Sequence, residues 1–359
     1  MDIGIVIGGE LGGLAERAGE AERAGFESVW VAETARSAFV QAAVASSATS
    51  SVTVGTNIAL AFPRSPTITA MSARDLAELS GGRFVLGLGT QVKRVNEQRF
   101  GVAFEHPAPK IAEAVEVIRA VLAAYEGRPI DHRGRFYSVT MPPFPGAGPA
   151  PSPVPIYLAA VGERMAETAG RVADGVMGHP MTSPGYVRDV LRPAVERGAA
   201  AAGRAASEVN ISTGVIVQVS DDADLARRDA ALQIGFYATT RTYRPMLAWH
   251  GFDGLIEPLR RAFVQRDLSA MAEIALPMVD ALAIAGREDE CRDRLAAFEG
   301  GGRPSHPGRS VGRHGTGAAG PERAVHPRGI RPGGETLKWW RGLMPFVQRP
   351  AWIHRVEGR

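Results

Sequence analysis

Seven short apolar segments alternate with helix-like segments along residues 1–300 of this chain. The apolar segments lie at 3–7, 28–31, 52–61, 84–88, 156–159, 176–177 and 209–219. Between them, small and apolar residues recur near the 3.6-residue spacing of an amphipathic helix. Strands that alternate with helices pair in parallel, so the pattern predicts an α/β fold.

A (β/α)8 TIM barrel and a doubly wound sheet both satisfy this alternation. We favour the barrel, because residues of chemical or conformational use follow the ends of the strands. Those residues are Gly8, Glu33, Pro63, Arg64, Thr90, Gln91, Gly162 and His179. In a barrel all of these strand ends share one face, where active sites are built. No G-x-G-x-x-G motif follows the first strand, which counts against a nicotinamide cofactor in a doubly wound domain.

Two stretches depart from the strand–helix alternation. Residues 127–153 contain a polar, aromatic, hairpin-like piece at 130–139 and then a loop rich in Pro and Gly. Residues 240–284 are helical in pattern, with breaks at prolines and glycines. We interpret both stretches as insertions in a single barrel domain that spans residues 1–300.

The sequence changes character after Gly300. Residues 301–335 are rich in Gly, Pro, Arg and His, with almost no apolar periodicity, which is typical of disorder. Residues 338–347 regain apolar character but do not have the pattern of a strand and helix, so we treat 301–359 as a low-complexity basic tail. An eighth strand is expected after the helical segment 288–298, and none can be recognised. We hypothesise that the native reading frame is lost near Gly300, so that the last βα unit is missing or replaced by an aberrant tail. A basic tail that recruits nucleic acid is the alternative, and resequencing the gene tests the hypothesis.

Charge and cysteine content exclude several classes of protein. The formal charge is +3, and the pI of 9.2 partly reflects the basic tail, so nucleic-acid binding is not indicated. Cys291 is the single cysteine, so no internal disulfide can form and a cytoplasmic location is expected. The first residues are too short a run for a signal peptide, and no run reaches the roughly 20 apolar residues that span a bilayer. His106 and His132 lack partners at ligand spacing, so no metal site is expected.

The segment 155–180 reads as strand, tight loop, helix and strand. Gly162 lies in the loop, and helix formers follow from Glu163 to Arg171. Unpaired N–H groups at a helix N-terminus, with roughly half a positive charge, form an anion site that suits a phosphate. The alternative is an ordinary αβ unit in which the glycine only shapes the turn.

Five pieces in order carry a resemblance to a known family. They are AERAGFESVWVAET, VGTNIALAFPRSP, LSGGRFVLGLGTQ, VPIYLAAVGERMAETAGRVADGVMGHP and GREDECRDRLAAF. Together they resemble the luciferase-like monooxygenase superfamily and, within it, the actinobacterial oxidoreductases that depend on the deazaflavin coenzyme F420. The resemblance implies a barrel with insertions and a flavin-like cofactor that lies across the carboxyl ends of the strands.

The resemblance also implies a set of cofactor contacts. The cofactor ring would lie over a non-prolyl cis peptide at Asn57–Ile58, with Thr90 and Gln91 near its edge. His179 would lie near the ring or near its side chain. The cofactor phosphate would meet the backbone at Val161, Gly162, Glu163, Arg164 and Met165.

The sequence departs from the family pattern at two positions that bear on catalysis. Glu33-Thr34 stands where many deazaflavin enzymes have Asp-His, and Val92-Lys93 stands where the sugar-phosphate dehydrogenases place a Glu. No proton donor is identified by motif, and a sugar-phosphate substrate is disfavoured.

Two residues are candidates for catalysis. Glu33 is the first candidate for an acid or base, since a carboxylate at a strand end in a partly apolar mouth could have a raised pKa. Its alternative role is to pair Arg36 or to cap the helix near Ser37. His179 is the second candidate, with a satisfied core or surface histidine as its alternative.

Four residues are weaker candidates for contact with substrate. They are Phe62, Arg64, Tyr243 and His250. Arg64 could also bind an acidic cofactor tail or close an ion pair within its loop. The aromatic residues near His250 are at helical spacing, which is more often typical of a core.

These features predict an oxidoreductase that transfers hydride between coenzyme F420 and a small organic substrate. An FMN-dependent monooxygenase on the same barrel is the alternative enzyme, and a non-catalytic cofactor-binding protein is the alternative of another class. Neither a nucleic-acid nor a membrane partner is expected. A homodimer is expected by analogy with the family.

Overall fold

The computed structural model describes residues 2–299 and 351–357. Its first half contains β1 (Asp2–Ile7), α1 (Leu14–Arg23), β2 (Ser28–Val31), α2 (Ala38–Ala48), β3 (Thr53–Thr56), β4 (Ala59–Leu60), α3 (Pro66–Leu79), β5 (Phe84–Gly89), α4 (Lys93–Arg99) and α5 (Pro107–Ala124). A hairpin, β6 (Ile130–Arg133) and β7 (Ser138–Met141), comes next, followed by β8 (Ile156–Ala160), α6 (Glu163–Val172) and β9 (Gly175–Gly178).

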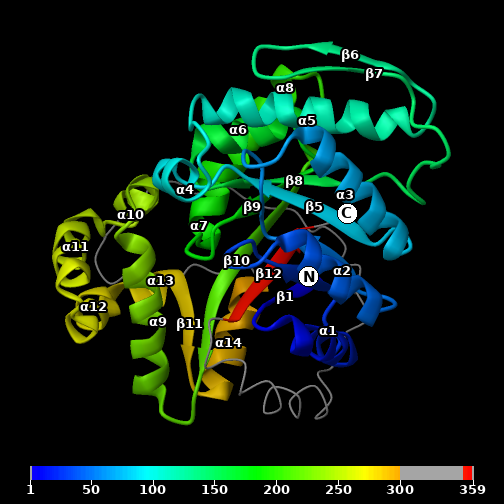
Figure 1. Cartoon of the computed structure of the whole chain (residues 1–359). Helices are drawn as coiled ribbons and strands as arrows, with labels where there is room; N and C mark the ends of the chain where they lie inside the picture. Colours follow the sequence, from blue (N-terminus) through cyan, green and yellow to red (C-terminus); the bar gives the residue numbers. More distant parts are fainter. Residues whose placement is uncertain (1, 300–350, 358–359) are drawn as a thin grey trace, which may run out of the picture.

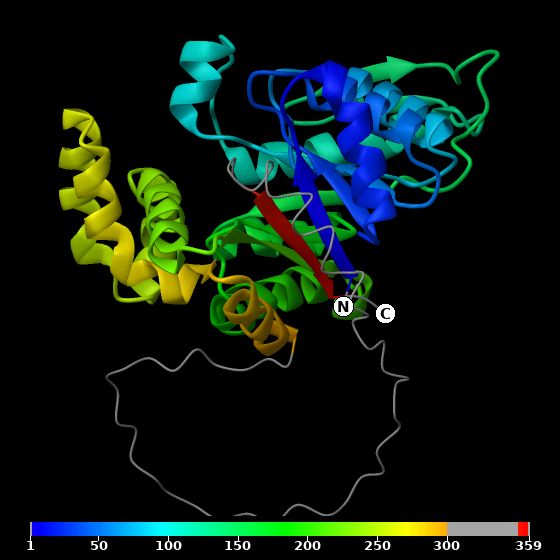
Figure 2. The ribbon, with the colours of Figure 1, turned by 90° about the horizontal axis from the view of Figure 1, so that it is seen from below.

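The second half of the described chain is mostly helical. It contains α7 (Pro184–Tyr186), a π-helical turn (Val187–Leu191), α8 (Arg192–Ala201), β10 (Asn210–Val219), α9 (Ala223–Ala238), α10 (Arg244–Trp249), α11 (Ile256–Gln265), α12 (Leu268–Ala275) and α13 (Val279–Leu282). The strand β11 (Ala283–Gly286), helix α14 (Glu288–Glu299) and strand β12 (Ala351–Glu357) complete it. Helices α9 to α13 form a lobe at one side of the barrel (Figures 1 and 2).

The strands close into a barrel, as the sequence predicts. The ring runs β1-β2-β3-β5-β8-β9-β10-β12 and returns to β1, while β4 and β11 each pair at its edge. Every pairing in the ring is parallel except those of β12. Helices α1, α2, α3, α5, α6 and α8 lie around the outside of the ring (Figure 1). The carboxyl ends of the parallel strands therefore gather at one mouth.

The eighth position of the ring corrects one expectation. No barrel element was expected within residues 301–359, yet Ala351–Glu357 forms β12 between β1 and β10. β12 runs antiparallel to both neighbours, so it fills the place of the parallel strand that should follow α14. Backbone N–H and C=O groups on β1 and β10 would otherwise form two open edges, and an antiparallel strand satisfies them without a crossover helix. The proposed loss of reading frame near Gly300 falls outside the described residues.

Two other boundaries differ from the sequence-based expectation. The third strand, expected as one run over 52–61, is divided into β3 and β4 at the cis peptide bond Asn57–Ile58. The helical segment expected up to residue 284 ends at Leu282, because residues 283–286 pair with β10 as β11. The second difference arises from pairing with a distant strand, which local periodicity does not report.

Large side chains fill the interior of the barrel. The buried cluster comprises Trp30, Val85, Tyr157 and Met177, with Val6 and Ile58 packed against it. Glycines opposite the large residues leave the necessary room. A Cβ built on Gly55 would lie 2.2 Å from the Trp30 ring, and one on Gly175 would lie 2.8 Å from the Tyr157 ring. The interior is therefore a packed plug below the mouth rather than a pore.

A buried carboxylate ties the hairpin β6–β7 to α5. Glu113 accepts hydrogen bonds from the backbone N–H groups of Arg135 (3.1 Å), Phe136 (2.9 Å) and Tyr137 (2.7 Å), and His132 Nε2 lies 3.4 Å from Oε1. Burial opposes ionisation of Glu113, but the amide and imidazole hydrogen bonds outweigh it and lower the pKa of the carboxyl.

We expect Glu113→Ala to destabilise the hairpin by about 2–3 kcal/mol, because it removes charge-assisted hydrogen bonds to three amides. Hydrogen exchange of the amides in β6 and β7 and urea unfolding would measure the loss. Glu116→Ala is the matched control, since Glu116 is an exposed glutamate of the same helix. Unchanged exchange at Phe136 and Tyr137 would contradict the expectation.

Candidate functional site

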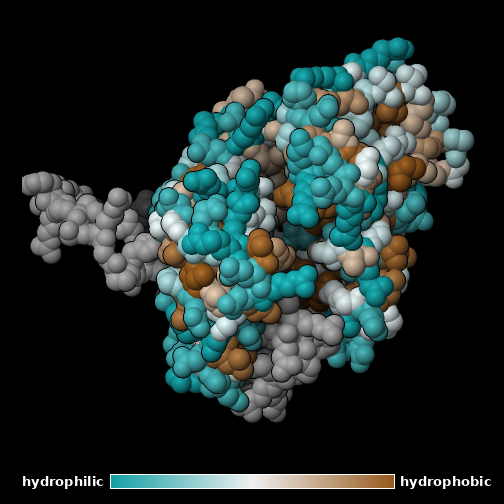
Figure 3. Space-filling view, turned by 60° about the vertical axis from the view of Figure 1, so that its left-hand side comes forward, coloured by the Kyte–Doolittle hydropathy of each residue, from teal (hydrophilic) through white to brown (hydrophobic). Residues whose placement is uncertain are grey.

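The mouth of the barrel brings together residues from the ends of β2, β3, β4 and β5. Glu33 follows β2, Asn57 and Ile58 separate β3 from β4, and Thr90 follows β5. These elements are neighbours in the ring, so residues that are far apart in sequence converge on one side of the mouth. Figure 3 shows the molecule turned toward its helical lobe, with hydrophobic side chains in a recess bordered by hydrophilic surface.

Glu33 and Arg64 form an ion pair at this edge of the mouth. Arg64 Nη1 donates to Glu33 Oε2 (2.7 Å), and Arg64 Nη2 donates to Glu33 Oε1. The Glu33 side chain is 6% exposed and that of Arg64 is 24% exposed. The Arg64 guanidinium also lies 5.1 Å from the centre of the Phe39 ring. An ion pair was considered for Arg64, but within its own loop, and the partner considered for Glu33 was Arg36. The structure instead pairs Arg64 with Glu33, 31 residues away.

Glu33 also holds the backbone that follows β3. Its Oε2 accepts the Leu60 N–H (2.8 Å), and its own N–H donates to Ile58 O (3.1 Å). Both carboxylate oxygens are thus occupied by donors. This arrangement favours a positioning role for Glu33, because an acid–base catalyst needs an oxygen that can reach the reacting atom.

Ile58 lies directly over Gly89 at the end of β5. A Cβ built on Gly89 would lie 2.6 Å from Ile58 Cδ1, so the glycine leaves the space that this side chain occupies. Ile58 also packs on the plug of the barrel interior. The segment Asn57–Leu60 therefore forms an apolar platform, which rests on the plug below and is clamped by Glu33 at its side.

Asn96 is a residue of the mouth that sequence reasoning did not select. Its side chain is 0% exposed, and its Nδ2 donates to Thr90 O (2.9 Å) and Val92 O (3.1 Å). Thr90 Oγ1 donates to Gln91 O (3.2 Å), and Gln91 has a φ of 55°. Asn96 thus shapes the loop that carries Thr90 and Gln91. The only sequence signal that could have identified Asn96 was its position in α4, three residues after the first residue of that helix. Sequence reasoning did not predict α4, so the signal was missed.

The N-terminus of α6 has the features of an anion site. The N-cap residue Gly162 provides no side-chain cap, so the first amides of the helix are left for another acceptor. The φ of Gly162 is −124°, which any residue can adopt, so its turn does not require glycine. A Cβ built on Gly162 would meet nothing within 4 Å, so there is open space beside the N-cap residue of this helix. A phosphate fits this space and this polarity.

Neighbouring groups hold the α6 loop in place. Tyr186 Oη donates to Val161 O (3.0 Å), and the N–H of Met165 donates to Gly162 O (3.2 Å). The Met165 amide is therefore partly engaged within the turn, while Glu163 and Arg164 occupy the first two positions of the helix. Of the five expected phosphate contacts, those of Glu163 and Arg164 best fit this geometry.

His179 follows β9 and packs against two tyrosines from the lobe. Its ring centre lies 4.7 Å from that of Tyr237 and 4.2 Å from that of Tyr243. Burial lowers the pKa of His179 to about 3 and raises that of Tyr243 to about 12. Burial also raises the pKa of Tyr237, so the three rings are uncharged near neutral pH and form an aromatic wall.

The remaining predicted residues lie apart from this wall. Phe62 is buried, with its ring centre 6.0 Å from that of Phe104 and Lys110 Nζ 4.9 Å from its ring. His250 Nε2 lies 3.2 Å from Ser183 Oγ in a second aromatic cluster with Tyr186. The structure thus brings Tyr243 to His179 and places His250 with residues that support the α6 loop.

Acid should destabilise the protein through His179. Its pKa in the folded protein lies below the usual 6.5, so the unfolded chain binds the additional proton between about pH 6.5 and pH 3. Stability from this residue is present above pH 6.5 and falls by up to about 1.4 kcal/mol per pH unit as the pH decreases through that window. We expect His179→Leu to flatten this part of the stability profile, as measured by urea unfolding at successive pH values. An identical slope in the two proteins would contradict the expectation.

Metal clusters and membrane-spanning helices are not found among the described residues. Within residues 2–299 and 351–357, no group of three or more His, Cys, Asp and Glu side chains could hold a metal ion. Over the same part of the chain, no helix has the length and apolar character to cross a membrane. Cys291 is buried, and burial raises the pKa of its thiol to about 11.

Comparison with known proteins matches residues 4–304 to a family described as luciferase-like monooxygenase. An uncharacterized protein of Mycobacterium tuberculosis is 40% identical over 290 residues, covering 79% of this chain and 85% of that protein. The 5,10-methylenetetrahydromethanopterin reductase of Methanolobus tindarius is 30% identical over 292 residues, covering 79% and 85%. The solved coenzyme F420 dependent tetrahydromethanopterin reductase of Methanopyrus kandleri superposes with a TM-score of 0.71 at 24% identity, covering 83% and 90%.

Proposed function

This chain belongs to the luciferase-like monooxygenase family, and on that basis we propose that it is an oxidoreductase that uses coenzyme F420 to transfer hydride to or from a small organic substrate. The similarity to the coenzyme F420 dependent reductase of Methanopyrus kandleri supports the choice of a deazaflavin over FMN. The observation that carries the proposal is the uncapped N-terminus of α6, with open space at Gly162, beside an apolar platform at Ile58.

The proposed site assigns a separate task to each side of the mouth. Amides of Glu163 and Arg164 would hold the cofactor phosphate, and Tyr186 would fix the loop through Val161 O. The Asn57–Leu60 platform would support the ring, and Asn96 would hold Thr90 and Gln91 at its edge. When bound, the deazaflavin supplies the hydride chemistry, and the protein supplies orientation and exclusion of water.

The aromatic wall would bound the substrate side. His179, Tyr237 and Tyr243 present rings that carry no charge near neutral pH. Tyr243 would remain a hydroxyl donor at neutral pH, since its pKa is raised to about 12. A neutral substrate suits this wall better than a phosphorylated one, because the three residues of the wall provide no positive charge to pair with a phosphate.

The proposal is tested by titrating the full-length protein with coenzyme F420 and with FMN, followed by fluorescence. We expect F420 to bind in the micromolar range or tighter, and FMN to bind more weakly. Binding of FMN alone would overturn the cofactor assignment and favour the monooxygenase chemistry that the family's description includes. Bound F420 that exchanges no hydride with any alcohol, aldehyde, enone or imine in a broad screen would favour a non-catalytic binding protein.

A homodimer in the cytoplasm completes the proposal. Light scattering coupled to size-exclusion chromatography of the full-length chain would measure whether it is a dimer. A monomer at micromolar concentration would contradict it.

A further inference from the structure

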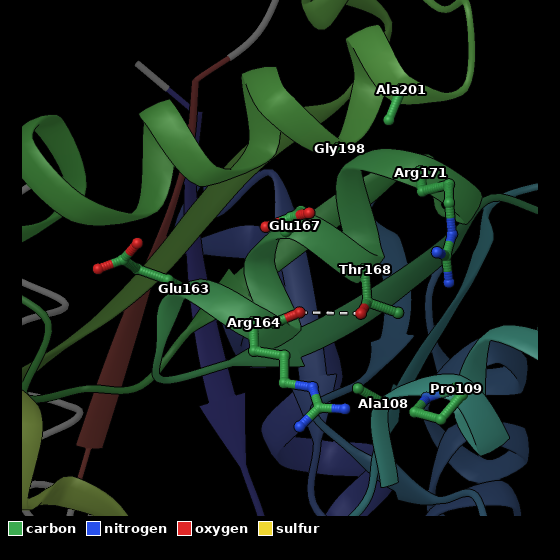
Figure 4. Close-up of a pocket in the computed structure, with 9 residues that line it drawn as sticks. All are labelled: Ala108, Pro109, Glu163, Arg164, Glu167, Thr168, Arg171, Gly198 and Ala201. Atoms are coloured by element: carbon green, nitrogen blue, oxygen red, sulfur yellow. Dashed lines mark hydrogen bonds between the residues drawn. The ribbon is translucent and has the colours of Figure 1, made fainter. Parts of the chain in front are cut away.

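A groove runs along the outer face of α6, starting at the proposed phosphate site. Its volume is about 430 Å³, and it is shared among three helices. The residues that line it are Ala108, Pro109, Glu163, Arg164, Glu167, Thr168, Arg171, Gly198 and Ala201 (Figure 4). Glu163 and Arg164 also begin α6, so the groove starts at the residues whose amides are assigned to the phosphate.

Charges of opposite sign are separated across this groove. Figure 4 shows Arg164 and Arg171 extending toward the side of Ala108 and Pro109, whereas Glu163 and Glu167 lie away from them. The two carboxylates are compensated by Arg197, at 2.9 Å from Glu163 and 3.9 Å from Glu167. Among the described residues, neither Arg164 nor Arg171 has a side-chain hydrogen bond, an ion pair or a ring contact. The side of the groove toward α5 therefore carries two uncompensated positive charges.

The first turn of α5 adds to this positive character. Ala108 and Pro109 belong to that turn, and the N-cap residue His106 makes no side-chain cap. The positive end of the dipole of this 18-residue helix lies at these residues, although Pro107 and Pro109 have no N–H to donate to an anion. Its contribution is supporting, since the arginines supply full charges.

The spacing of the arginines indicates the shape of the ligand. Arg164 and Arg171 are seven residues apart on one helix, which corresponds to about 10 Å along its axis. A single small anion cannot span that distance, whereas a chain with several carboxylates can contact both guanidinium groups. The groove is therefore suited to an extended, acidic chain that leaves the phosphate site.

We propose that this groove binds the acidic side chain that continues beyond the phosphate of a deazaflavin cofactor, and that it selects that cofactor over FMN. The inference rests on the proposed function. In coenzyme F420 the phosphate is a diester that leads into a chain of glutamates, whereas in FMN the phosphate ends the molecule. Only the first can place carboxylates beside Arg164 and Arg171 while its phosphate occupies the α6 N-terminus.

The test is a fluorescence titration of the full-length protein with deazaflavin species that share the phosphate but carry no, two or five glutamates. We expect affinity to rise about 10- to 100-fold from the species without glutamates to the longest, and this gain to shrink in high salt. Arg171→Gln should lower affinity for the glutamylated species about 3- to 10-fold and leave the species without glutamates unchanged. Arg164→Gln should also lower affinity for the glutamylated species.

Arg128→Gln is the matched control, because Arg128 is an exposed arginine beyond the opposite end of α5. It should bind every species as the unmodified protein does. Equal affinity for all three species, or equal losses in Arg171→Gln and Arg128→Gln, would overturn the groove assignment and leave the proposed function intact. Failure of every deazaflavin species to bind, with FMN bound, would overturn the proposed function itself.

Discussion

Gly162→Asp is expected to remove binding of the phosphate-bearing cofactor while the protein remains folded. The Cβ of the new residue would meet no atom within 4 Å, and the φ of −124° suits any residue, so the substitution causes no strain. Aspartate is also a favourable N-cap residue, which should stabilise α6 by about 0.5–1 kcal/mol. The same carboxylate would occupy the space assigned to the phosphate and would repel it.

The expected loss of cofactor affinity is at least about 100-fold, equivalent to about 2.8 kcal/mol. Fluorescence titration with coenzyme F420 would measure it, and thermal unfolding would confirm the fold. Gly162→Ser is the control for size without charge, and it should lose far less affinity. A phosphate-free deazaflavin is the control ligand, since its weaker binding should change little. Unimpaired F420 binding by Gly162→Asp would eliminate the α6 N-terminus as the phosphate site.

Breaking the Glu33–Arg64 pair is expected to have the second largest effect, and the effect should be asymmetric. Arg64→Met keeps an apolar stem near Phe39 but leaves a carboxylate that is 6% exposed without its cation. We expect a cost of about 3–4 kcal/mol, because an uncompensated buried charge is strongly destabilising. Glu33→Gln should cost less, about 1–2 kcal/mol, since the neutral amide can still accept the Leu60 N–H.

Both substitutions should also weaken cofactor binding, because Glu33 holds the Ile58–Leu60 backbone that would support the ring. Urea unfolding and F420 titration of each variant measure the two effects. The exposed pair Arg133–Asp131 is the control, and its loss should change stability by no more than about 0.5 kcal/mol.

The same variants separate the two roles considered for Glu33. If Glu33 were a catalytic acid or base, Glu33→Gln would abolish turnover with little change in stability or cofactor affinity. A positioning role instead predicts parallel losses in stability and affinity. Turnover per bound cofactor would then fall only modestly.

Local chemistry was sufficient to predict much of the barrel. Amphipathic spacing located α1, α3, α6 and α9, and short apolar runs located β1, β2, β5 and β10. The same signal failed for α4, which has few apolar positions and follows a loop shaped by Asn96. It also gave no indication of β12, since that strand is defined by the open edges of β1 and β10 rather than by its own pattern.

The sequence by itself determined the alternation of strands and helices, the glycine at the start of α6 and the family resemblance, because these depend on neighbouring residues. Only the tertiary structure decided which groups meet. Glu33 and Arg64 are 31 residues apart, and His179 meets Tyr237 and Tyr243 from a different lobe. Ring closure brings such residues into contact, and contact in turn decides whether a carboxylate is paired or an imidazole is desolvated. The role of a side chain in this mouth therefore depends on its partners in space, which local sequence does not encode.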